Sequence, residues 1–99
     1  MNITIQSVHF DAADQLKEFV QQKVGKLDVF FDSIIDVEVI LKLEKAEVVE
    51  NKVAEIGINI PGVDLFAKKQ AKTFEGAVDL SCEALRKQLI KRKEKIKSK

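Results

Sequence analysis

The alternation of apolar and polar residues along the chain predicts four strands and two helices. Period two, the repeat of a half-buried strand, marks residues 2–8, 35–45, 53–60 and 63–67. Residues 12–28 instead place apolar side chains three and four positions apart, which predicts a helix with one buried face. The same spacing returns after Thr73 and continues toward the end of the chain, so we expect a second, longer helix there.

The expected order of elements is β-α-β-β-β-α, which defines an α+β fold. The strands are apolar on one side only and several connections are short. We therefore expect a four-stranded, mostly antiparallel sheet with both helices on its apolar face. No repeat or linker interrupts the pattern, which predicts a single domain over residues 1–99. The opposite sheet face is expected to stay in water and would carry Thr4, Gln6, Glu38, Lys42, Glu44, Glu55, Asn59 and Asp64.

The last helix is predicted to be longer than the sheet it covers. Its apolar positions within about 60° of one another in projection are Val78, Cys82, Leu85, Leu89 and Ile96. About 25 helical residues would span about 38 Å, whereas strands of about six residues are only about 20 Å long. We therefore expect the last turns, including Arg92, to project beyond the sheet into solvent.

Composition excludes several classes of protein. The chain has 99 residues and one Cys, so no intramolecular disulfide can form, which fits a reducing compartment. No apolar run is as long as the roughly 18–20 residues of a membrane span, and the N-terminus lacks the pattern of a signal peptide. We therefore expect a soluble, cytoplasmic protein without a membrane partner.

Charge is strongly segregated along the chain, although the formal net charge is only +1. Residues 1–62 hold 6 Lys and 11 acidic residues, whereas residues 63–99 hold 11 Lys or Arg and 5 acidic residues. On the last helix, one flank of the apolar stripe carries Arg86, Lys93 and Lys97, and the other carries Lys87, Lys91 and Lys95. Arg92 falls near the stripe itself, and Lys68 and Lys69 precede the helix. Such segregation is a first indication of a polyanionic partner.

Three interpretations of this basic helix compete. A solvated lysine-rich face is the ordinary one. A nucleic-acid interface is about as well supported as this solvated face, because the acidic residues are concentrated in the other half of the chain. A membrane-surface helix is disfavoured, since only Ile90 and Ile96 are apolar beyond Leu89. Without aromatic side chains to stack on bases, charges on two flanks suit phosphates and hence the shape of folded RNA.

Candidate catalytic and metal-binding residues are few. His9 is the only imidazole and is assigned to the surface or to loop packing. Cys82 lies within the apolar stripe and is assigned to the core. One Cys and one His cannot complete a zinc site, and no glycine-rich phosphate loop occurs. We expect no enzymatic activity, cofactor, metal or small-molecule substrate.

Two segments of the chain resemble the ribosome hibernation promoting factor family, which includes the ribosome-associated inhibitor proteins and the sigma-54 modulation proteins. The first segment combines LKEFV at 16–20, KL at 26–27 and FD at 31–32 with DVEVILKLEK at 36–45. The second joins AVD at 77–79 to the basic run LRKQLIKRK at 85–93. The likeness follows the order of nearly the whole chain and departs at Ala13, Thr73 and Glu75, near the starts of the two helices.

This resemblance implies a fold like a double-stranded-RNA-binding domain and a role in dormancy or stress. It also implies binding to the small ribosomal subunit and its 16S rRNA within the 70S ribosome. The site would be the decoding channel, where mRNA and tRNA lie, so that translation is blocked. Family contacts with RNA would fall on the last helix, at Arg86, Lys87, Lys91, Arg92, Lys93, Lys95 and Lys97. Lys68 and Lys69 join this set on charge alone. The chain looks like a short member of the family, or the N-terminal domain of a longer one.

Two other functions fit the residues. A protein-interaction adaptor would dock a basic partner on the acidic, partly apolar outer sheet face, through Glu38, Ile40 and Glu44. A general double-stranded-RNA binder would use the same basic helix without preferring ribosomes. The sequence leaves both alternatives open.

Overall fold

The computed structural model describes residues 1–45 and 47–97, with side chains described up to Glu94. Its elements are β1 (Asn2–Val8), α1 (Asp14–Gly25), the 3-10 turn η1 (Lys26–Val29), β2 (Asp36–Leu43), β3 (Lys52–Ile60), β4 (Val63–Ala71) and α2 (Phe74–Lys97). The predicted order, β-α-β-β-β-α, is therefore confirmed.

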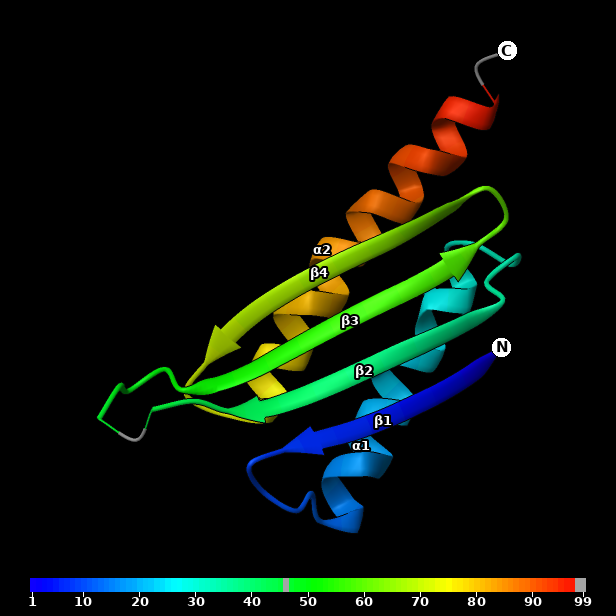
Figure 1. Cartoon of the computed structure of the whole chain (residues 1–99). Helices are drawn as coiled ribbons and strands as arrows, with labels where there is room; N and C mark the ends of the chain where they lie inside the picture. The colour runs from blue at the N-terminus through cyan, green and yellow to red at the C-terminus, as the bar shows by residue number, and fades with distance from the viewer. Residues whose placement is uncertain (46, 98–99) are drawn as a thin grey trace.

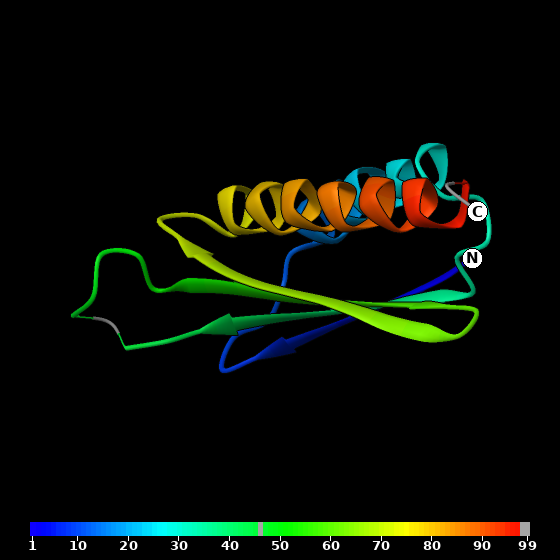
Figure 2. The same ribbon diagram turned by 90° about the horizontal axis from the view of Figure 1, so that it is seen from above.

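The four strands form one sheet in the order β1-β2-β3-β4 (Figure 1). Strands β2, β3 and β4 pair antiparallel, whereas β1 pairs parallel with β2. The parallel pair follows from α1, because a helix between two strands returns the chain to the same end of the sheet. Both helices cover one face of this sheet, and the other face has no helix over it (Figure 2). The predicted two-layer, mostly antiparallel architecture is confirmed.

The first helix is shorter than its apolar spacing predicts. It ends at Gly25, and η1 continues the turn through Val29. Glycine weakens a helix and 3-10 turns often finish one. The tighter turn keeps Leu27 in the core at 2% exposure, so the apolar periodicity is preserved although the helix type changes.

The fourth strand is longer than predicted and extends to Ala71. Residues 68–70 are Lys-Lys-Gln and all are exposed, so apolar and polar residues do not alternate over this part of the strand. The ladder with β3 nevertheless continues as far as the pair of Lys52 and Ala71. An edge strand needs few buried side chains, and in β4 only Ala67 and Ala71 are buried.

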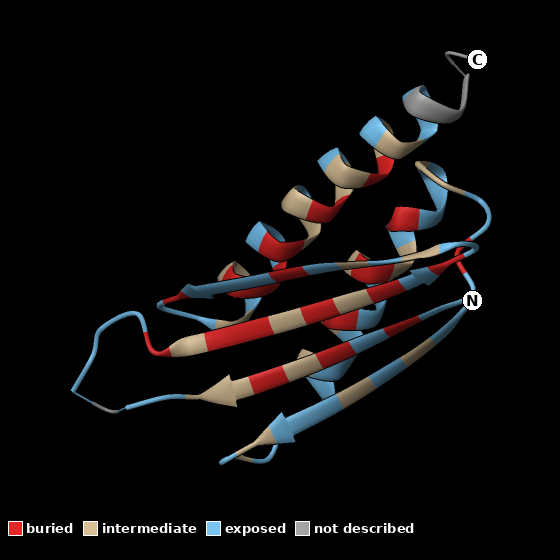
Figure 3. Ribbon diagram, turned by 45° about the horizontal axis from the view of Figure 1, so that its top comes forward, coloured by how far each residue is buried: buried red, intermediate tan, exposed pale blue. Residues whose placement is uncertain are grey.

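The core lies between the sheet and the helices, with buried positions concentrated on β2, β3 and the facing side of α2 (Figure 3). In α2, Val78, Leu85 and Leu89 are fully buried. Ser81 is buried among them, and its Oγ donates a hydrogen bond of 3.3 Å to the carbonyl oxygen of Ala54 in β3. This bond satisfies the one hydroxyl that the helix carries into the interface.

The start of α2 is fixed by two local contacts. The Thr73 hydroxyl accepts a hydrogen bond of 3.0 Å from the backbone N–H of Gly76, which is the contact of a helix N-cap. The ring of Phe74 stacks on Phe10, which precedes α1, with centroids 4.3 Å apart. The beginnings of the two helices are therefore joined, and the predicted start at Thr73 is confirmed.

Contact between α2 and the sheet continues farther along the helix than the sequence predicts. The Gln88 side chain donates a hydrogen bond of 3.1 Å to the carbonyl oxygen of Phe66 in β4. One turn later, a Cβ placed on Gly62 in the β3–β4 turn would lie 3.8 Å from the Arg92 guanidinium. Arg92 thus packs beside the sheet rather than on an overhang. Strand β3 has nine residues, so the sheet is longer than the estimate assumed.

Truncating Leu89 tests how strongly this packing holds α2. We expect Leu89→Ala to lower the free energy of unfolding by about 2–5 kcal/mol, because a fully buried leucine leaves a cavity. Lys91→Ala is the matched control, since Lys91 is exposed two residues away and its loss should cost within about 0.5 kcal/mol. Urea denaturation followed by circular dichroism measures both, and equal losses would contradict the packing described above.

Candidate nucleic-acid interface

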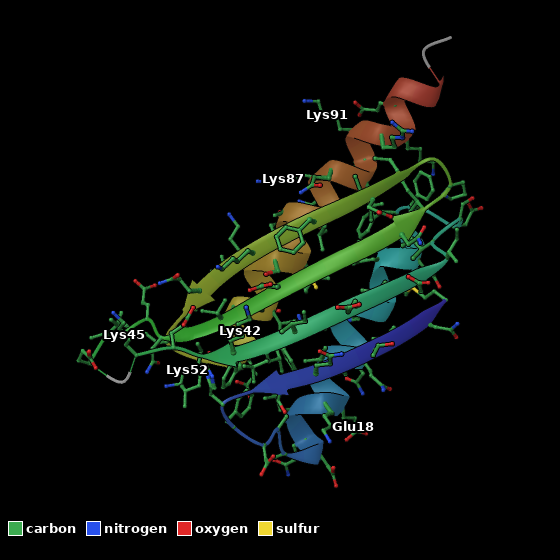
Figure 4. All side chains as sticks on the ribbon, viewed as in Figure 1. Glu18, Lys42, Lys45, Lys52, Lys87 and Lys91 are labelled. Atoms are coloured by element: carbon green, nitrogen blue, oxygen red, sulfur yellow. The ribbon has the colours of Figure 1, made fainter. Side chains whose placement is uncertain are left out.

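Three lysines of α2 stand free on the surface of the helix. Lys87, Lys91 and Lys93 are exposed, and within the described part of the chain none of them forms an ion pair. Lys87 and Lys91 project from the same side of α2 (Figure 4). Lys91 follows Gln88 by three residues and therefore borders the flank that faces β4. Lys93 falls on the opposite flank, so both predicted basic flanks exist.

Arg86 is already engaged within the protein. Its guanidinium forms an ion pair and hydrogen bonds with Glu83, one turn earlier in α2. It also lies 5.8 Å from the ring centroid of Phe30, within range of a cation–π contact. The hydrogen bond from Arg86 lowers the pKa of Glu83, and the same bond raises the pKa of Arg86. Arg86 therefore differs from the three free lysines, because its charge is already paired within α2.

Arg92 is half-buried between α2 and the β3–β4 turn. Its Nε is buried and has no hydrogen-bond partner among the described residues. The guanidinium tip lies beside Gly62, which has a positive φ of 90°. Arg92 therefore differs from the three free lysines, because part of its head packs against backbone.

The two lysines of β4 point to opposite faces of the sheet. Lys68 pairs in register with Glu55 on the outer face, and its Nζ lies 4.0 Å from the Glu55 carboxylate. Lys69 pairs in register with buried Ala54 and so belongs to the side that carries the helices. The structure brings Lys69, but not Lys68, to the same side as α2.

Lys95 and Lys97 belong to α2 by their backbone. Their side chains lie outside the described part of the structure, so their place in the candidate interface remains a prediction from the sequence.

Sequence analysis missed a second group of lysines, at the end of the sheet where β2 leads into β3. Lys42, Lys45 and Lys52 lie near that end (Figure 4), but they do not form one cluster, because Lys42 belongs to the outer face of the sheet and Lys52 to the helical face. Lys42 lies 2.9 Å from Glu55, and this hydrogen bond raises the pKa of Lys42. The group escaped notice because these residues are scattered through the acidic half of the sequence. The hairpin register of β2 and β3 would have placed Lys42 and Lys52 at the same end of the sheet, on opposite faces.

The residues considered for chemistry occupy ordinary structural places. His9 is exposed, and its Nδ1 lies 3.4 Å from the carbonyl oxygen of Leu43. Cys82 is partly buried beside the core. Burial, aided by the nearby Asp79 carboxylate, raises the pKa of this thiol to about 11. Across residues 1–45 and 47–97, the structure holds no metal-binding group of three or more His, Cys, Asp or Glu.

No helix in the described ranges is both long enough and apolar enough to cross a membrane.

Comparison with known proteins identifies the family. Residues 3–97 match the family described as Sigma 54 modulation protein / S30EA ribosomal protein. The chain is 33% identical over 95 residues to a ribosome hibernation promoting factor from Azotobacter vinelandii, covering 96% of this chain and 85% of the relative. It is 30% identical over 97 residues to the protein of that name from Escherichia coli K12, covering 98% of each. The chain belongs to the ribosome hibernation promoting factor family, which is not an enzyme family.

Solved structures confirm the fold. A ribosomal subunit interface protein from Coxiella burnetii aligns with a TM-score of 0.84 and 23% identity, over 95% of this chain and 99% of that one. The N-terminal domain of Protein Y from Thermus thermophilus aligns with a TM-score of 0.77 and 22% identity, over 92% and 98%. At these identities the likeness supports the α+β architecture alone.

The raised pKa of Cys82 predicts a pH dependence of stability. The folded protein holds the thiol proton up to about pH 11, whereas an ordinary thiol loses it near 9.0. Between these values the folded state binds more protons than the unfolded state, so the Cys82 contribution to stability is lost as pH rises. Urea denaturation from pH 8 to 11 should show a steeper decline for the native sequence than for Cys82→Ala. Parallel declines would show that the thiol is not held in its protonated form.

Proposed function

We propose that this protein binds the small ribosomal subunit and inhibits translation during dormancy or stress. Family membership supports the ribosome as the partner, since the relatives are named ribosome hibernation promoting factors. The site we propose is the decoding channel, around the A and P sites, and the ligand is 16S rRNA. The protein would then act in the cytoplasm, bound to the small subunit or the 70S ribosome.

The main support for this proposal is a set of unpaired lysines on a helix that is packed against the core. Lys87, Lys91 and Lys93 are exposed and unpaired among the described residues, while Leu85 and Leu89 of the same turns are fully buried. The core therefore fixes where these side chains leave the helix before RNA arrives, which reduces the entropy lost on binding. Point charges on flexible stems suit phosphate oxygens rather than base edges.

The proposed inhibition is occupancy, without turnover. Phosphate contacts hold the basic helix on the rRNA, and the folded body fills space that mRNA and tRNA need. Lys69 lies on the same side of the sheet as α2 and extends the basic surface there. Lys95 and Lys97 would continue it along the last turns of the helix.

Removing the three free lysines tests the assignment of the interface. Each phosphate contact changes the slope of log affinity against log salt by about 0.7–0.9. Changing Lys87, Lys91 and Lys93 together to Gln should therefore flatten the slope for small-subunit binding by about 2–3, and the melting temperature should stay within a few degrees. Sedimentation with purified small subunits at several salt concentrations measures this slope.

A matched variant separates a local contact from general charge. Lys17, Lys26 and Lys45 are also exposed lysines, and changing these three to Gln removes the same charge elsewhere. This variant should keep the original slope. Binding that survives the α2 change at physiological salt, or that falls equally in both variants, would overturn the interface.

Competition with RNA duplex separates the ribosome from the alternative partner. We expect that a far higher concentration of long RNA duplex than of unlabelled small subunits is needed to displace labelled small subunits from the protein. The reason is that the site requires folded rRNA. A general double-stranded-RNA binder would show comparable affinity for both. Equal competition by duplex in a filter-binding assay would therefore favour that alternative.

A further inference from the structure

The outer face of the sheet, which no helix covers (Figure 2), carries a hollow of about 330 Å³. It lies over Gly57 in the middle of β3, toward the end of the sheet where β2 begins and β4 starts. Its lining includes Asp36, Glu38 and Ile40 of β2 and Asp64 and Phe66 of β4. The basic helix lies on the other side of the sheet, so this hollow is separate from the proposed RNA interface.

The strand register places the lining residues in rows. Asp36, Asn59 and Asp64 form one row across β2, β3 and β4, and Glu38, Gly57 and Phe66 form the next. Neighbouring strands are about 4.8 Å apart, so side chains of β2 and β4 face each other across about 10 Å. Because Gly57 has no side chain between them, the hollow has a backbone floor with carboxylates and an aromatic ring around it.

The carboxylates of these two rows are not neutralised within the described part of the protein. Asp36, Glu38 and Asp64 are exposed and form no ion pair there. In contrast, Glu55 in the next row has Lys42 at 2.9 Å and Lys68 at 4.0 Å. The outer face therefore has a paired region around Glu55 and, at the hollow, three carboxylates without an ion pair among the described residues. Such a surface repels RNA and attracts a cation.

An exposed aromatic ring completes the site. Phe66 is 56% exposed, although its neighbours Leu65 and Ala67 in β4 face the core. Ile40 adds a half-buried apolar side chain at the far side of Gly57. A cation that also offers a flat apolar surface would gain from both the ring and the carboxylates.

We propose that this hollow binds an arginine side chain presented by an extended basic segment of a protein partner. A guanidinium is planar, stacks on aromatic rings and donates paired hydrogen bonds to carboxylates, whereas a lysine ammonium has no flat face. The hollow opens on the free sheet face, so a small molecule would remain largely uncovered. A peptide segment makes further contacts along the strands and is the occupant that the surface fits.

Glu44, which the sequence grouped with Glu38 and Ile40, does not belong to this site. It follows the end of β2 and lines a separate depression with Lys45, Val48 and Gln70 beside the β2–β3 loop. The acidic face that the sequence predicts as one surface therefore consists of two separate parts. Only the part around Gly57 forms the hollow.

Peptide binding to the isolated protein tests this inference without any ribosome. The probe is a fluorescein-labelled nine-residue peptide of alternating Arg and Gly, and the comparison peptide has Lys in place of Arg. We expect tighter binding of the arginine peptide by fluorescence anisotropy, and its addition should shift the backbone amide NMR signals of Gly57 and Phe66. Equal binding of the two peptides would contradict recognition of a guanidinium.

Three variants locate the site. Changing Asp36 to Asn, Glu38 to Gln and Asp64 to Asn together should weaken binding by about ten- to a hundredfold. Phe66→Leu should weaken it by about two- to fivefold. Gly57→Val should abolish it by filling the hollow. A Cβ at Gly57 meets only the Leu65 carbonyl oxygen, at 3.9 Å, and valine favours strands, so this variant should keep or raise the melting temperature.

The matched control removes the same charge from the β2–β3 loop by changing Glu44, Glu47 and Glu50 to Gln. This variant should bind the arginine peptide within about twofold of the native protein. An equal loss in this control, or unchanged binding by Gly57→Val, would show that attraction is diffuse and would overturn the proposal. The Gly57→Val protein should still sediment with small subunits, so failure here is distinguishable from failure of the proposed ribosome interface.

Discussion

The burial of one stripe of α2 against the sheet determines where the charged side chains of the helix lie. Leu85 and Leu89 are fully buried, and the Gln88 side chain holds the helix against the β4 backbone. Because a helix turns about 100° per residue, fixing this stripe fixes the direction of every charged side chain between its members. Lys87 and Lys91 therefore cannot turn inward, and the helix presents them as a preformed cationic surface.

The sheet separates charge in the same way. Period two sends Lys68 to the outer face and Lys69 to the helical side, although the two residues are adjacent in sequence. On the outer face, Glu55 forms ion pairs with Lys42 and Lys68. The carboxylates of Asp36 and Asp64 form no ion pair among the described residues. A chain with a formal net charge of +1 thus builds two surfaces of opposite sign on opposite sides of one sheet.

Periodicity was enough to predict the element order, the two layers and most of the core, because Val37, Ile56 and Leu89 each follow a clear repeat. It failed where the repeat was hidden. Edge strand β4 carries exposed residues on both faces near its end, and Gly25 changes the helix type without changing burial. Pairing between distant residues was not visible either. The ion pair of Arg86 with Glu83 is local in sequence, but the contact of Arg92 with Gly62 depends on how the helix lies over the hairpin.

The proposed function requires that the basic helix direct this protein to the channel that mRNA and tRNA use. Sedimentation of the protein with purified small subunits, as mRNA and tRNA are added together in increasing amounts, tests it most directly. The fraction of protein sedimenting with the subunits should fall as the competitors bind. If saturating mRNA and tRNA leave co-migration unchanged, the protein does not bind in the decoding channel, because it then occupies a different part of the subunit.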